Sequence, residues 1–126
     1  YLKRKIGQWS ADKEAFAPEA LAEYLRCFSD PAAIHASCED YRAAASIDLE
    51  YDRADLARKV SCPLLALWGA QGLPGRSTDV LALWRERAAD VRGFALPCGH
   101  FLAEEAPQAT EDALRVFFLE DNGGKR

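Results

Sequence analysis

The spacing of apolar residues divides the chain into two parts. In the first part they recur every three or four positions, which is the period of an amphipathic helix. Residues 16–30 predict one helix with Pro18 in its first turn, and residues 31–46 predict a second helix that opens at Pro31. We expect these two helices to be short and antiparallel.

The period changes after a third, brief helix, which is predicted over residues 52–59 with Asp52 as its cap. The run "CPLLALWG" (residues 62–69) is continuously apolar, which is typical of a strand buried on both faces of a parallel sheet. Residues 78–90 again have helical spacing, and residues 91–97 predict a second strand. The order strand, helix, strand predicts a βαβ unit.

The last part of the chain predicts a helix over residues 106–120, with Pro107 near its start. Two parallel strands leave their outer edges and apolar faces open, so we expect further strands to come from elsewhere. The chain begins with Tyr1 and contains no methionine, which indicates a piece of a longer protein. The predicted class is α/β, the C-terminal end of a doubly wound fold.

Composition excludes several classes of protein. The chain has 126 residues, of which 49% are hydrophobic and 29% charged, as expected for one soluble globular domain. A formal net charge of −4 argues against a nucleic-acid partner. Its apolar runs are shorter than the roughly 20 residues of a membrane span, so we expect no membrane association and a cytoplasmic protein. The four cysteines contain no C-x-x-C pair and predict buried free thiols, with no metal, cofactor or disulfide.

One of the two histidines occupies a position that favours chemistry. His100 follows Gly99 in a turn just past the carboxyl end of the second predicted strand, where active-site groups collect in open α/β sheets. The alternative is a surface or core-edge histidine without a role. Glu104 and Glu105 precede a predicted helix, where the helix dipole favours negative charge, and we assign them no chemistry.

Three segments in register resemble a known family. The stretches "CEDYRAAASIDLEYDRAD", "CPLLALWGAQG" and "CGHFLAEEAP" resemble, in this order, the C-terminal half of the haloacetate (fluoroacetate) dehalogenases of the α/β-hydrolase superfamily. The resemblance implies that residues 1–46 are the C-terminal part of a helical cap. It implies that residues 47–119 are the C-terminal part of the α/β-hydrolase core, and we expect residues 120–126 to form a flexible tail.

The resemblance also implies a reaction. In this family an aspartate attacks the carbon that bears the halogen, and a histidine then activates water to hydrolyse the ester, so that haloacetate becomes glycolate and halide. His100 corresponds to that general base, Tyr41 to a cap tyrosine that holds the halide, and Trp9 to a cap tryptophan near the substrate. The nucleophile would precede this chain. The implied partner is a small haloacid, with a possible homodimer at full length.

One position separates this family from other α/β hydrolases. Many of them carry the acid that orients the histidine a few residues after the penultimate strand, but here Gly72 stands there. Asp79 and Asp90 are weaker candidates, because an acidic helix start and a turn explain them. An epoxide or carboxylester hydrolase and a non-enzymatic remnant or interaction module remain as alternatives.

Overall fold

The computed structural model describes the backbone of residues 1–122 and side chains as far as residue 119. The last four residues of the expected tail lie outside this range, and residues 121 and 122 belong to the final helix. None of the described helices is long and apolar enough to cross a membrane. The elements are α1 (Leu2–Trp9), α2 (Pro18–Cys27), α3 (Pro31–Ala44), α4 (Ile47–Ala54), β1 (Leu64–Gly69), α5 (Leu73–Ser77), α6 (Val80–Arg87), β2 (Val91–Leu96), α7 (Leu102–Glu105) and α8 (Pro107–Asn122).

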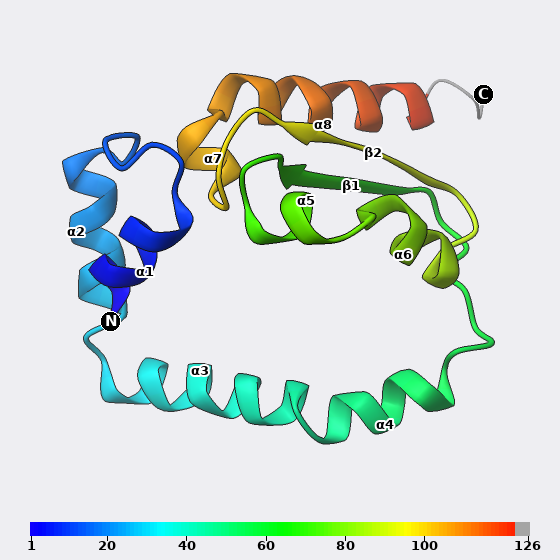
Figure 1. Cartoon of the computed structure of the whole chain (residues 1–126), viewed down its shortest axis with the longest axis horizontal. Coiled ribbons are helices and arrows are strands. Elements are labelled where there is room, and N and C mark those ends of the chain that lie inside the picture. Colours follow the sequence, from blue (N-terminus) through cyan, green and yellow to red (C-terminus); the bar gives the residue numbers. More distant parts are fainter. Residues whose placement is uncertain (123–126) are drawn as a thin grey trace.

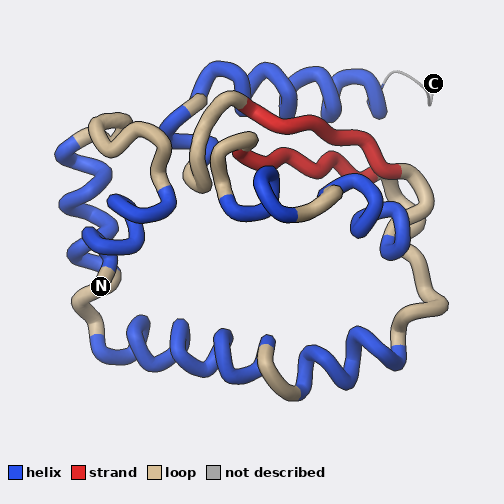
Figure 2. Tube along the Cα trace, in the orientation of Figure 1, coloured by secondary structure: helices blue, strands red, loops and turns tan. Residues whose placement is uncertain are grey.

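The predicted βαβ unit is confirmed. β1 and β2 are parallel and in register from the pair Leu64 and Val91 to the pair Gly69 and Leu96, and α6 lies between them in the chain. Figure 1 shows α8 along one side of the strand pair and α5 and α6 along the other. Figure 2 shows the helical segment α1–α4 running around the outside of this α/β part.

The core of the described chain is small, and β1 is only partly covered within it. Within the described part, the buried apolar residues are Ile6, Ala66, Ala88, Leu96 and Cys98. Most other β1 residues are half-buried, because only one further strand and a few helices lie beside them. Within the described residues β1 is therefore half-buried, and its open faces are where the strands expected from elsewhere would pack. The apolar faces that remain open include both strand and helix residues, among them Trp84, Phe94, Leu114 and Phe118.

The bounds of the third predicted helix differ in the structure. The third helix is Ile47–Ala54 rather than residues 52–59, so Asp52 lies inside α4 and caps nothing. Its carboxylate instead accepts a hydrogen bond of 2.7 Å from Arg87 at the end of α6. The short helices α1, α5 and α7 were not predicted.

The two helices predicted over residues 16–30 and 31–46, which are α2 and α3, are not an antiparallel pair. Figure 1 shows α3 leaving the end of α2 at a steep angle and running on into α4. The turn between them is closed by Asp30, whose carboxylate accepts from the Ala32 N–H at 2.8 Å and caps α3. Pro31 occupies the first turn of α3, where its missing N–H costs nothing.

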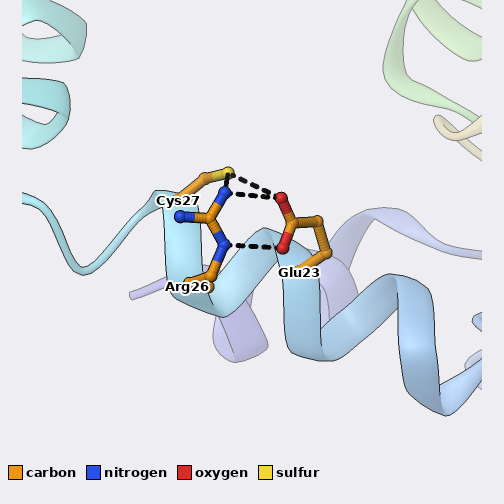
Figure 3. A network of polar contacts seen from close by, with 3 residues as sticks. All are labelled: Glu23, Arg26 and Cys27. Atoms are coloured by element: carbon orange, nitrogen blue, oxygen red, sulfur yellow. Dashed lines mark hydrogen bonds and ion pairs between the residues drawn. The ribbon is translucent and has the colours of Figure 1, made fainter.

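The four cysteines are free thiols, and of the predicted buried thiols only Cys98 is buried, whereas Cys27, Cys38 and Cys62 are exposed. Cys27 lies at the end of α2 beside a bidentate pair in which Arg26 donates two hydrogen bonds of 2.7 Å to Glu23 (Figure 3). The hydrogen bonds from Arg26 lower the pKa of Glu23. The pair is exposed to solvent and therefore contributes little to stability.

Candidate functional site

His100 lies on the loop that follows β2, at the carboxyl end of the two parallel strands. The two residues before it, Cys98 and Gly99, are buried, whereas His100 itself is exposed. Its ring centroid lies 5.0 Å from that of Trp9 and 5.1 Å from that of Phe101, both in edge-on geometry. The histidine therefore contacts two aromatic rings while it remains exposed to solvent.

The position of this loop depends on two glycines. A Cβ on Gly69, at the end of β1, would lie 1.6 Å from the Gly99 carbonyl oxygen. A Cβ on Gly99 would lie 2.4 Å from the Ala11 nitrogen and 2.7 Å from the Trp9 carbonyl oxygen. The loop is thus packed between the end of β1 and the segment that follows α1, with no room for a side chain at either glycine.

We expect Gly99→Ala to lower the free energy of unfolding by about 1–3 kcal/mol, because the added methyl must displace the backbone around Ala11. Gly7→Ala is the matched control. A Cβ on Gly7 has open space around it, and alanine in a helix interior is favoured over glycine by about 0.5–1 kcal/mol. Thermal unfolding of both variants measures the difference, and equal unfolding temperatures would contradict the packing described here.

A single carboxylate joins the histidine loop to the segment after α1. Oε2 of Glu105 accepts from the N–H groups of Ala11 at 2.7 Å, Asp12 at 3.1 Å and Gly99 at 3.0 Å. Oε1 accepts from the Phe101 N–H at 3.1 Å. Four donors from two segments of the chain therefore converge on the side chain of Glu105. The sequence analysis had explained the presence of this glutamate by the helix dipole alone.

The environment of Glu105 favours its charged form. Partial burial opposes ionisation, but the hydrogen bonds from the four backbone N–H groups outweigh it and lower the pKa of Glu105. These bonds therefore stabilise the fold above the ordinary pKa of a glutamate, and the stabilisation is lost as the pH falls through the lowered value. Burial and the nearby negative charge of Glu105 raise the pKa of the Cys98 thiol.

Trp9 connects the histidine loop to a cavity. The Trp9 carbonyl accepts from the His100 N–H at 2.9 Å, and its ring also faces Phe101. A cavity of about 970 Å³ opens beside it among α1, α2 and α3, with a mainly apolar lining that includes Trp9, Phe101 and Tyr41. Tyr41 projects from α3 and is 63% exposed. The structure therefore brings Trp9 and Tyr41 to one cavity, and Trp9 also contacts His100.

Lys5 places a positive charge at the same cavity. Its ammonium lies 4.6 Å from the centroid of the Trp9 ring and 5.6 Å from that of Tyr1. Lys5 and Asp40 both line the cavity, so its wall carries one charge of each sign. The residue was not singled out from the sequence, although Lys5 and Trp9 are four positions apart and so share a helix face.

Among the described side chains, no carboxylate binds the imidazole of His100. Gly72 does lie beside the histidine loop, since its Cβ would be 3.5 Å from the Gly99 carbonyl, but it offers no acid. Asp79 caps α6 by accepting from the Ala82 N–H at 3.0 Å, and Asp90 faces Arg92 at 3.9 Å. Neither aspartate orients the histidine, and the described residues contain no cluster of three metal-ligating side chains.

Two known proteins that resemble this chain in sequence are named as hydrolases. A fluoroacetate dehalogenase from Burkholderia sp. is 42% identical over 119 residues, which are 94% of this chain and 39% of that protein. A soluble epoxide hydrolase from Corynebacterium sp. (strain C12) is 34% identical over 121 residues, which are 94% of this chain and 41% of that protein. No family model matches the chain.

The solved structures agree on the fold. A protein from Nostoc sp. PCC 7120, described as an α/β hydrolase, is 61% identical with a TM-score of 0.91, over 94% of this chain and 40% of that protein. The chain thus spans about two fifths of the length of its relatives. It is the C-terminal portion of an α/β-hydrolase fold, similar in sequence to fluoroacetate dehalogenase.

Proposed function

We propose that this chain is the C-terminal part of a hydrolytic dehalogenase that converts haloacetates to glycolate and halide. The observation that carries the proposal is the contact of Trp9 with His100 on one side and with the cavity lined by Tyr41 on the other. The sequence similarity to a fluoroacetate dehalogenase supports the choice of substrate.

The proposed reaction has two steps. An aspartate supplied by the preceding part of the protein attacks the substrate carbon, so that a carbon–oxygen bond forms and the halide leaves with the bonding electrons. His100 then removes a proton from water, and the resulting hydroxide adds to the ester carbonyl. Cleavage of the ester returns the aspartate, which loses the proton of the added hydroxyl to solvent, and the leaving oxygen of glycolate takes the proton from His100. His100 acts only in the second step.

The two aromatic residues have separate proposed roles. Tyr41 donates its hydroxyl proton in a hydrogen bond to the departing halide, which stabilises the charge that develops there. Trp9 holds the imidazole by edge-on ring contact at 5.0 Å and presents its other side to the substrate cavity.

We expect the 126-residue chain alone to release no halide above background, because the nucleophile is proposed to precede it. A fluoride electrode measures release from fluoroacetate by the purified chain and by the complete protein under the same conditions. The complete protein should release fluoride in proportion to its concentration. Turnover by the isolated chain would show that the nucleophile lies within these residues.

An epoxide hydrolase is the second candidate, because a soluble epoxide hydrolase is 34% identical to the chain. A histidine that hydrolyses an ester serves either reaction, so His100 does not separate them. Diol formation from a small epoxide, measured beside fluoride release from fluoroacetate by the same preparation, does separate them. Diol formation without fluoride release would replace the dehalogenase proposal with this one.

A further inference from the structure

We infer that the carboxylate of Glu105 is a positioning residue, which fixes His100 relative to Trp9 for hydrolysis of the ester. The inference rests on the proposed function, because it assigns the histidine a step that depends on its position. Glu105 itself does not contact the imidazole, and its effect is carried through the backbone that it holds.

Two of the hydrogen bonds to Glu105 come from the residues on either side of His100. Glu105 accepts from the N–H of Gly99, immediately before the histidine, and from the N–H of Phe101, immediately after it. The intervening N–H, that of His100, donates to the Trp9 carbonyl at 2.9 Å. The three consecutive backbone N–H groups of residues 99–101 therefore all have an acceptor. These three hydrogen bonds fix the backbone of the loop and with it the Cα–Cβ direction of His100.

The hydrogen bonds on the other side reach the segment that carries Trp9. Ala11 and Asp12 donate to the same oxygen of Glu105 that accepts from Gly99, although they lie 94 and 93 residues away from Glu105 in the sequence. A shared acceptor requires both backbones to approach one atom. A change at Glu105 therefore moves the histidine loop and the Trp9 segment relative to each other, rather than moving either one alone.

The positioning role of Glu105 requires the negative charge of its carboxylate as well as the length of its side chain. Hydrogen bonds to an ionised acceptor are shorter and stronger than those to a neutral one. A glutamine at this position would keep the length of the side chain, but its NH₂ group would face backbone N–H donors and could accept from none of them. Glu105→Gln therefore removes part of the acceptor set with little change in volume.

The neighbouring Glu104 provides a matched control. It is also in α7, and it accepts a hydrogen bond from the Tyr24 hydroxyl on α2. Its side chain makes none of the contacts to Gly99, Phe101 or the Trp9 segment. Glu104→Gln makes the same chemical change one residue away and leaves the histidine loop intact.

In the complete protein, we expect Glu105→Gln to slow ester hydrolysis by about 100-fold, the size of effect expected for a misplacement of about 1 Å. The first displacement should be preserved, so one equivalent of fluoride is released in a burst and the aspartyl ester accumulates. Rapid mixing followed by intact-mass measurement detects both. kcat should fall far more than the burst rate, and Glu104→Gln should behave as wild type.

A merely structural role gives a different result. A loss of folded protein reduces the burst and the steady turnover in parallel and accumulates no ester, and this outcome would overturn the inference. Unchanged turnover would overturn it as well. If Glu105→Gln does not fold, Glu105→Asp, which keeps the charge on a shorter side chain, is expected to accumulate ester, and its failure to do so counts equally against the inference.

A second readout does not depend on activity. The imidazole proton resonances of His100, identified by their loss in His100→Ala, report its position against the Trp9 ring. We expect them to shift in Glu105→Gln and not in Glu104→Gln, and unchanged resonances would overturn the inference. If His100→Ala itself accumulates no ester while these resonances shift as expected, the proposed function has failed and the positioning role of Glu105 stands.

Discussion

His100→Ala in the complete protein is expected to trap the aspartyl ester and to lower steady turnover by roughly 100-fold or more. The first displacement does not use the histidine, so a burst of about one halide per active site should remain. Intact-mass spectrometry after mixing with chloroacetate measures the adduct, which should appear in the mutant and not in the wild type. The exposed position of His100 means that the replacement removes ring contacts but little buried surface.

The other histidine is the control for this experiment. His35 lies on α3 with a side chain that is 75% exposed, and it does not line the cavity. His35→Ala should therefore turn over normally and form no adduct. A His100→Ala protein that shows normal turnover without adduct would remove His100 from the mechanism.

Tyr41→Phe is expected to slow fluoroacetate turnover about 10- to 150-fold. A hydrogen bond to a charged acceptor contributes about 1.5–3 kcal/mol, and 1.36 kcal/mol corresponds to about tenfold in rate. Chloroacetate should be affected less, because fluoride concentrates its charge on a smaller atom and depends more on donors aimed at it. Steady-state rates with both substrates measure the difference.

Tyr51→Phe is the matched control for Tyr41. Tyr51 is 64% exposed on α4, close to the 63% of Tyr41, and it does not line the cavity. Neither replacement should change the thermal stability much, because both keep the ring. Equal slowing of the two substrates by Tyr41→Phe, or no slowing, would make Tyr41 a packing residue.

The sequence was sufficient for the α/β part of the fold and less so for the helical part. The apolar run before Gly69 and the helical spacing after Asp79 are local signals, and they located β1, α6 and β2. The bounds of α4 were misplaced, and the pairing of Asp52 with Arg87, 35 residues away, is a contact that no local pattern contains. The short helix α5 contains Pro74 and Gly75, whose presence favours a loop on sequence grounds.

In the candidate site, too, the residue marked by a local pattern was predicted and the residue defined by distant contacts was not. His100 could be singled out because its position after a strand is a local feature, and the residues flanking Gly99 carry the family resemblance. Glu105 could not be singled out, because all four of its partners are backbone N–H groups, those of Ala11, Asp12, Gly99 and Phe101, and backbone donors leave no mark on the sequence. The one feature of the sequence that points to this packing is Gly99 beside His100, where the structure leaves no room for a side chain.

The ester intermediate is the central claim, and a single turnover in H₂¹⁸O tests it most directly. Enzyme in excess over fluoroacetate is quenched after one turnover, and the glycolate is analysed by mass. The account predicts unlabelled glycolate, because its hydroxyl oxygen comes from the aspartate and the water oxygen remains on the enzyme. Labelled glycolate in the first turnover, which requires direct attack of water on the substrate carbon, would contradict the account.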